Sequence, residues 1–350
     1  MAVVTHTVAP PAGYQQSQWF RRGPTGRLLV PGIVAAVLVA IAALGLARVV
    51  PLVGAPVLAL ALGIGVSVIR RPAKVLRPGI RWSGRYVLQS AIVVLGGTLS
   101  LARIASVGMR TLPVMLGTLT AALLVALLVG RALGIPGSLR TLVGVGTGIC
   151  GASAIAAVSG VIEASEVDIA YAMSTIFIFN LIAVLLFPPI GHLLGLSQSG
   201  FGLWAGTAVN DTSSVVAAGY AFGHTAGVHS VIVKLTRTTM IIPVVAVLGT
   251  VARRRDADRT VRWHTVIPWF LVWFLAAAIL ESVGLVPASW HAGLASLAVM
   301  LITVALAAIG LSTHLGDLRR AGYRPLMLGT ATWMTVAVTG LLLQFAVGSW

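Results

Sequence analysis

Apolar stretches of about twenty residues recur along the whole chain, and this repetition limits the fold more than any other sequence feature. A helix of that length crosses the hydrocarbon core of a bilayer. We therefore expect an all-α, polytopic membrane protein with about 11 transmembrane helices by this criterion. The expected spans are residues 28–47, 51–69, 86–102, 111–133, 139–159, 168–188, 200–220, 226–250, 265–286, 291–313 and 325–348.

The composition excludes a soluble protein. Of the 350 residues, 58% are hydrophobic and 9% are charged, whereas soluble domains carry roughly 25% charged residues. The net charge of +16 would suit a nucleic-acid-binding protein, but the charges lie in short segments between apolar spans. They indicate a lipid bilayer as partner and no nucleic acid. Cys150 is the only cysteine, and no cofactor motif or metal-ligand spacing occurs, so we expect no cofactor and no metal.

The positions of the basic residues predict the orientation. Residues 1–27 are expected to form a cytoplasmic N-terminal tail, and residues 28–350 the integral membrane domain. A cleaved signal peptide is the alternative, but the apolar run 28–47 is long for one. The predicted inner segments hold Arg21, Arg22, Arg27, Arg70, Arg71, Lys74, Arg77, Arg81, Arg85, Arg131, Arg140, Arg253, Arg254, Arg255, Arg259, Arg262, Arg319, Arg320 and Arg324. This bias predicts the N-terminus inside the cell membrane and the C-terminus outside. Arg48, Arg103 and Arg110 fall outside, and Glu163, Glu166 and Asp168 share one predicted outer loop.

Two pairs of similar segments, called echoes here, suggest an internal repeat. Residues 96–118 resemble residues 310–330, and these copies would start from opposite sides of the membrane, as in an inverted repeat. Residues 146–158, "GTGICGASAIAAV", resemble residues 206–218, "GTAVNDTSSVVAA". On the predicted topology this second pair would run parallel.

Three charged residues lie near the centre of predicted spans: Asp211, Lys234 and Arg237. Each costs about 2.5–3.5 kcal/mol at that depth, so such residues usually face a partner or a watery cavity. Lys234 and Arg237 share a helix face, and one carboxylate cannot neutralise both. An anion would complete the cluster. The alternative is that Asp211 bridges one cation while the other reaches a lipid headgroup.

The stretch "GVGTGICGASAIAA", residues 144–157, predicts a broken membrane helix. Each interior glycine costs about 0.5–1 kcal/mol relative to alanine. A helix that restarts at the midplane exposes unpaired N–H groups, which bind anions. Close helix packing on small residues is the alternative. With the midspan charges, the break predicts a substrate-binding set: Thr147, Gly148, Cys150, Gly151, Ser153, Asn210, Asp211, Thr212, Lys234 and Arg237.

Three stretches, "GTGICGASAIAA", "FGLWAGTAVNDTSSVVAAG" and "VIVKLTRTTMIIPV", resemble the YeiH-type family of bacterial inner-membrane proteins, which is associated with sulfate export. That family looks like a relative of the bile-acid symporter and sodium–proton antiporter fold. The resemblance implies two inverted repeats, a core domain with crossed broken helices, and a panel or dimerisation domain, hence a homodimer. Many members carry His-Glu where this chain has Asn210 and Asp211.

These observations predict a secondary active transporter, not an enzyme. The expected activity is export of a small oxyanion, sulfate-like or sulfonate-like, by alternating access. Asp211 would bind the coupling ion, H⁺ or Na⁺. A cation–proton antiporter that uses Asp211 is the alternative. From other classes, a membrane scaffold or an intramembrane enzyme using Cys150 or Ser153 with Asp211 would also fit.

Overall fold

The computed structural model describes residues 26–49, 54–253, 268–313 and 323–348, and all regular structure within these ranges is helical. Residues 1–25 of the predicted tail 1–27 lie outside them, as do the basic residues of 254–262 and 319–320 and small parts of two predicted spans. The elements are α2 (Gly26–Val49), α3 (Ala55–Ile69), α4 (Arg77–Trp82), η1 (Ser83–Val87), α5 (Leu88–Gly96), α6 (Leu101–Ala132), α7 (Gly137–Val145), η2 (Gly146–Cys150), α8 (Ala152–Ile162), α9 (Glu166–Leu193), α10 (Gln198–Ala208), α11 (Thr212–Phe222), α12 (His224–Thr238), α13 (Ile241–Arg253), α14 (Trp269–Ser282), α15 (Ala288–Ser312) and α16 (Tyr323–Ala346).

Each predicted span coincides with one or two of these helices, which confirms the all-α membrane fold. Six helical segments are individually long and apolar enough to cross a membrane. Two boundaries differ clearly from the prediction: the span predicted at 111–133 begins at Leu101, and the span predicted at 86–102 is shifted toward the N-terminus. Its helix begins at Arg77 and ends at Gly96, because arginines at a helix end keep their charge in the interface while their stems cover apolar surface.

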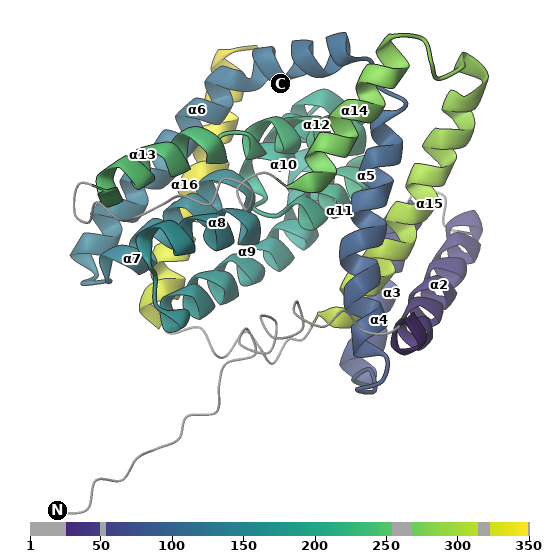
Figure 1. The fold of residues 1–350 in the computed structure, drawn as a ribbon, viewed down its shortest axis with the longest axis horizontal. Coiled ribbons are helices and arrows are strands. Elements are labelled where there is room, and N and C mark those ends of the chain that lie inside the picture. The colour runs from purple at the N-terminus through teal and green to yellow at the C-terminus, as the bar shows by residue number, and fades with distance from the viewer. Residues whose placement is uncertain (1–25, 50–53, 254–267, 314–322, 349–350) are drawn as a thin grey trace, which may run out of the picture.

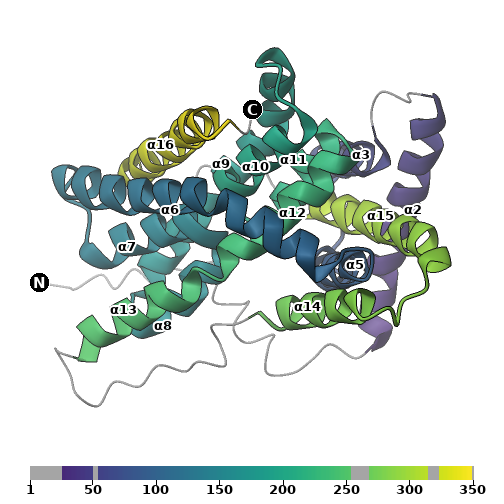
Figure 2. The same cartoon turned by 90° about the horizontal axis from the view of Figure 1, so that it is seen from above.

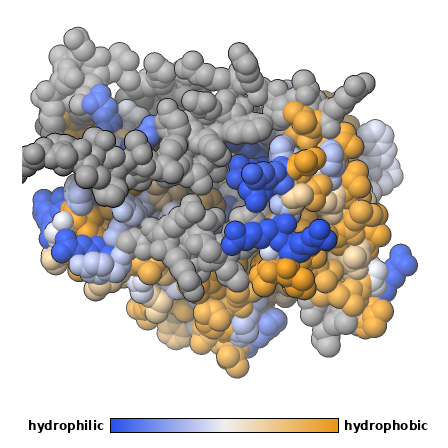
Figure 3. Space-filling view, turned by 90° about the horizontal axis from the view of Figure 1, so that it is seen from below, coloured by the Kyte–Doolittle hydropathy of each residue, from blue (hydrophilic) through white to orange (hydrophobic). Residues whose placement is uncertain are grey.

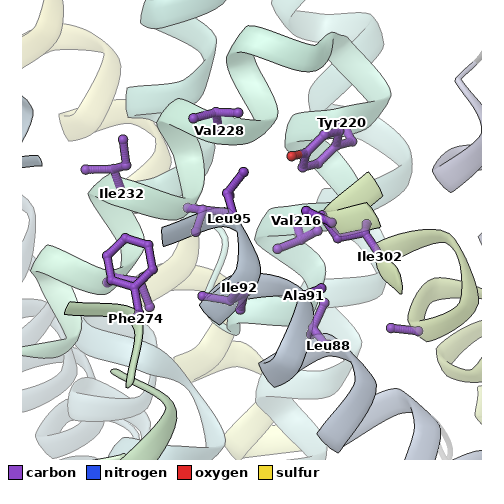
Figure 4. Close-up of a cluster of buried hydrophobic side chains, with 14 of the residues drawn as sticks. Leu88, Ala91, Ile92, Leu95, Val216, Tyr220, Val228, Ile232, Phe274 and Ile302 are labelled. Atoms are coloured by element: carbon purple, nitrogen blue, oxygen red, sulfur yellow. The ribbon is translucent and has the colours of Figure 1, made fainter. Parts of the chain in front are cut away.

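The helices pack in two groups (Figures 1 and 2). One group contains α2, α3, α4, η1, α5, α14 and α15, and the other contains α6 to α13 with α16. A hydrophobic cluster joins them (Figure 4): Leu88, Ile92 and Leu95 of α5 face Val216 of α11 and Ile232 of α12. The second group contains all the predicted binding residues.

The segment from Gly137 to Ile162 folds back on itself and is called hairpin 1. Its first limb is α7 with the π-helical turn η2, and its second limb is α8. The Ser138 hydroxyl, at the start of α7, donates to the Asp168 carboxylate at 2.5 Å. Since α9 begins four residues after α8 ends, this bond places the start of α7 and the end of α8 at the same end of the hairpin.

The segment from Gln198 to Phe222 is a second such hairpin, hairpin 2, built from α10 and α11. The Gln198 amide, at the start of α10, donates to the Phe222 carbonyl at the end of α11, at 3.4 Å. The rings of Phe201 and Phe222 stack with centroids 4.0 Å apart. Both ends of hairpin 2 therefore lie together, and its tip is the turn at Val209, Asn210 and Asp211.

The two hairpins enter from opposite sides. Helix α9 has 28 residues, about 42 Å at 1.5 Å per residue, and joins the base of hairpin 1 to that of hairpin 2. The pair on which the inverted repeat was predicted, residues 96–118 and 310–330, lies partly outside the described residues. The other echo, 146–158 and 206–218, aligns the two tips, so its copies are related by inversion. The expectation that these copies run parallel is wrong: each broken helix reverses at its tip instead of continuing.

The loop with Glu163, Glu166 and Asp168 was also predicted on the wrong side relative to its neighbours. It lies at the base of hairpin 1, with Ser138 and hence on the side of Arg140. The reason is the same reversal. The bias of basic residues is unaffected, since acidic residues contribute little to orientation. Replacing two membrane crossings by two hairpins also leaves the predicted sides of the N-terminus and the C-terminus unchanged.

Candidate functional site

The tip of hairpin 1 turns at Gly151, which has φ 64° and ψ −125°. Only glycine adopts this backbone conformation without strain. The Gly151 amide donates to the Gly146 carbonyl at 2.8 Å and closes the π-helical turn. The glycine-rich sequence thus permits a tight reversal inside the helix bundle, and α8 restarts at Ala152.

The tip of hairpin 2 is held by Asn180 of α9 and by Asp211. The Asn180 side-chain oxygen accepts from the Asn210 and Asp211 amides at 3.0 and 3.3 Å. Its amide nitrogen donates to the Asp211 carboxylate at 3.3 Å. Asp211 also accepts from the backbone amide and hydroxyl of Ser213, at 2.7 Å each, and from the Ser214 hydroxyl at 2.8 Å. Asp211 therefore caps the N-terminus of α11 with both carboxylate oxygens engaged.

The two tips touch inside the protein, at a place called here the junction (residues 146–153 and 207–212). A Cβ atom built on Gly151 would lie 3.2 Å from the Asp211 Cβ and 3.4 Å from the Asn210 carbonyl carbon. Residues from distant parts of the sequence, with Gly151 and Asp211 at matching positions of the internal echo, thus meet directly. The two broken helices therefore meet at their breaks, tip to tip.

Lys234 of α12 donates to one carbonyl from each tip. Its Nζ lies 2.9 Å from the Ile149 oxygen and 2.8 Å from the Val209 oxygen. These two acceptors occupy matching positions of the echo. Lys234 is 0% exposed, so the alternative in which it reaches a headgroup is wrong.

Arg237, one turn further along α12, also bridges both tips. Its Nε donates to the Gly148 carbonyl at 2.6 Å, and its Nη1 donates to the Thr207 carbonyl. Arg237 is likewise 0% exposed. Carbonyls at a helix C-terminus carry partial negative charge and have no partner within the helix. Lys234 and Arg237 supply that partner for both first limbs.

Trp333 of α16 was not predicted by the sequence analysis, yet it completes the end of α10. Its indole N–H donates to the Ala208 carbonyl at 3.1 Å. With Arg237 on Thr207 and Lys234 on Val209, the carbonyls of these three successive residues each have a side-chain donor. Every residue has a backbone carbonyl, so no sequence pattern could indicate that Trp333 donates to one of them.

The N-terminus of α8 is the one helix end at the junction without a side-chain cap. Its N-cap is Gly151, and Ser153 in its first turn is exposed. Three further buried groups at the junction have polar atoms without a hydrogen-bond partner: the Thr147 hydroxyl, the Asn210 amide and Nη2 of Arg237. Polar atoms without a hydrogen-bond partner are therefore found on both tips and on Arg237.

A model for a family described as "Conserved hypothetical protein 698" matches residues 31–329. The chain belongs to this family. A UPF0324 membrane protein of Streptococcus pyogenes serotype M3 is 39% identical over 335 residues, which cover 92% of this chain and 98% of the relative. A UPF0324 membrane protein of Clostridium tetani is 40% identical over 312 residues, covering 85% and 90%. No solved structure matches the chain.

Membership of this family confirms the predicted resemblance to YeiH-type proteins. It also confirms that the chain is a multi-pass membrane protein. Within this family member, the predicted binding residues all lie on the two tips or on α12. Cys150 is buried and Thr212 half-buried. Asp211 forms no ion pair with Lys234 or Arg237, all three being among the described residues. The alternative in which Asp211 bridges one cation is therefore wrong, because both cations donate to backbone carbonyls instead.

Proposed function

We propose that this protein is a secondary active transporter that exports a small oxyanion, sulfate-like or sulfonate-like, by alternating access. One observation carries the proposal: of the four helix ends at the junction, only the N-terminus of α8 has no N-cap hydrogen bond and no charged side chain as partner, its one side-chain contact being the Cys150 thiol at the Ala154 amide. An oxyanion would supply that partner, because helix N-termini offer N–H donors and a positive dipole end.

The charge balance at the junction favours an anion over a cation. Lys234 and Arg237 together outnumber Asp211, which leaves one net positive charge when all three are ionised. Their backbone contacts fix both cations without cancelling them. The partnerless atoms of Arg237, Asn210 and Thr147 include N–H and O–H donors. Donors of these kinds suit the oxygens of a tetrahedral anion.

Asp211 is proposed to couple transport to H⁺ or Na⁺. Either ion would compete with the Ser213 and Ser214 donors for the carboxylate and so weaken the cap of α11. A ligand that binds one state better shifts the balance between inward and outward states. In this scheme the second helix group is the moving core, and the first group is the panel through which a homodimer would form.

The rival functions have less support. A cation–proton antiporter would use Asp211 as its ion site, but it would leave the excess positive charge at the junction and the uncapped N-terminus of α8 without a role. An intramembrane hydrolase would need Cys150 or Ser153 hydrogen-bonded to a base. The groups that donate to the Asp211 carboxylate are those of Asn180, Ser213 and Ser214, so neither candidate nucleophile is paired with it. We place the protein in the cell membrane, with its N-terminus in the cytoplasm.

Replacing Ser153 with aspartate tests the anion site. The new carboxylate would lie in the first turn of α8 and compete with an anion for the same N–H groups. We expect Ser153→Asp to lower sulfate flux in proteoliposomes at least about tenfold, with an unchanged or higher thermal unfolding temperature. Ser153→Asn, a neutral matched control, should keep most of the flux. Wild-type sulfate flux in Ser153→Asp would exclude this end of α8 as the anion site.

Replacing Asp211 with asparagine separates binding from coupling. The neutral amide cannot take up H⁺ or hold Na⁺ electrostatically, but it keeps nearly the same shape. We expect Asp211→Asn to retain exchange of sulfate for sulfate and to lose accumulation driven by a pH or Na⁺ gradient. If purified wild-type protein moves Na⁺ or H⁺ without any anion, and Asp211→Asn abolishes this, the antiporter assignment replaces ours.

A further inference from the structure

The segment from Arg70 to Arg85 carries a dense positive charge at one end of the first helix group. The basic surface consists of Arg70, Arg71, Lys74, Arg77, Arg81 and Arg85, all exposed except the half-buried Arg77. It includes α4 and η1, which pack against α2 and α15. The first acidic residue in the sequence is Glu163, so none lies within this segment.

Two aromatic residues lie within the basic surface. The rings of Trp82 and Tyr86 have centroids 5.6 Å apart, and the side chains are 36% and 43% exposed. The Arg85 guanidinium carbon is 5.5 Å from the Tyr86 ring centroid. Tryptophan and tyrosine prefer the headgroup level of a bilayer. The pair therefore places the neighbouring arginines at the depth of lipid phosphates.

The basic surface is held rigidly and borders apolar surface. A Cβ atom on Gly79 of α4 would lie within 2.0 Å of the Leu29 carbonyl of α2, so the two backbones are in close contact. Arg77 Nε donates to the Pro72 carbonyl at 3.4 Å and ties the preceding turn to α4. Nearby, Ile69 is 88% exposed. Figure 3, which views the end where α4 lies in Figure 1, shows hydrophilic residues beside a broad hydrophobic surface.

We propose that this surface binds the phosphate of an anionic glycerophospholipid. Arginine presents a planar set of donors that matches phosphate oxygens, and Arg81 and Arg85 are four residues apart on one continuous helical segment. Trp82 and Tyr86 would pack against the glycerol region, and the apolar side chains beside them against an acyl chain. On the predicted topology this lipid belongs to the cytoplasmic leaflet, where juxtamembrane basic clusters attract anionic lipids.

The test is lipid binding to the purified full-length protein, followed by native mass spectrometry with phosphatidylglycerol and phosphatidylcholine. We expect phosphatidylglycerol to bind more tightly, and Arg81→Gln with Arg85→Gln to weaken it about fivefold for each arginine removed. The matched control is Arg103→Gln with Arg110→Gln, two exposed arginines of α6, which should leave the affinity unchanged. Trp82→Leu with Tyr86→Leu should weaken binding without changing the charge.

Three outcomes would overturn the proposal. The first is equal affinity for the two lipids, and the second is equal loss of phosphatidylglycerol binding in both arginine pairs. The third is displacement of the lipid by inorganic phosphate at matched concentration, which would indicate a bare phosphate site. Thermal unfolding of each variant in the same detergent shows whether it remains folded. None of these measurements involves transport, so the result is independent of the proposed function.

Discussion

Replacing Lys234 with methionine should strongly destabilise the junction. Methionine has a similar length but no donor, so the Ile149 and Val209 carbonyls both lose their partner. A buried polar group without a partner costs about 1–3 kcal/mol, hence about 2–6 kcal/mol for the pair. Relief of the buried ammonium offsets part of this cost. We expect a clear fall in the thermal unfolding temperature in detergent and loss of anion flux.

Lys234→Gln provides the matched control for this prediction. Glutamine keeps two N–H donors and removes the charge, so it can still satisfy a carbonyl. The unfolding temperature of Lys234→Gln should lie between those of the wild type and Lys234→Met, while its anion affinity should fall with the lost charge. If methionine and glutamine give the same unfolding temperature, the carbonyl contacts contribute little and Lys234 acts through its charge alone.

The helical segments, and the burial of Lys234 and Arg237 within them, could be predicted from the sequence because both depend on local composition. Apolar length indicated the spans, and charges inside apolar runs indicated Asp211, Lys234 and Arg237. The glycine cluster indicated the break near Gly151. Each of these signals is a property of residue type. Because the bilayer thickness sets the length of a spanning helix, the signals also indicate where in a span each residue is expected.

The course of the chain after each break could not be predicted in the same way. A glycine at a break permits both a kink and a reversal, and the choice depends on tertiary contacts such as Gln198 with Phe222. The partners of Lys234 and Arg237 were missed for a related reason. Their acceptors are backbone carbonyls, which every residue has. The sequence therefore suggested an anion as the partner of the two cations, whereas in the structure the carbonyls at two helix ends are their partners.

Replacing Gly151 with alanine should separate the two tips. The backbone at Gly151 has φ 64°, which strains any residue with a Cβ atom, at a cost of about 1–3 kcal/mol. The added methyl would also lie 3.2 Å from the Asp211 Cβ and 3.3 Å from the Ile176 Cγ2. Overpacking in a tight core costs about 1–3 kcal/mol more. We expect a lower unfolding temperature and loss of anion flux.

Gly160→Ala is the matched control on the same helix. Gly160 lies within α8, and a Cβ atom there would have no neighbour within 4 Å. This variant should be unchanged or stabilised by about 0.5–1 kcal/mol, the usual gain for alanine over glycine inside a helix. If Gly151→Ala unfolds at the same temperature as Gly160→Ala, the tips do not depend on the left-handed turn. Because Asp211 lies against Gly151, an intact Gly151→Ala protein with full flux would also show that the spacing between the tips does not limit transport.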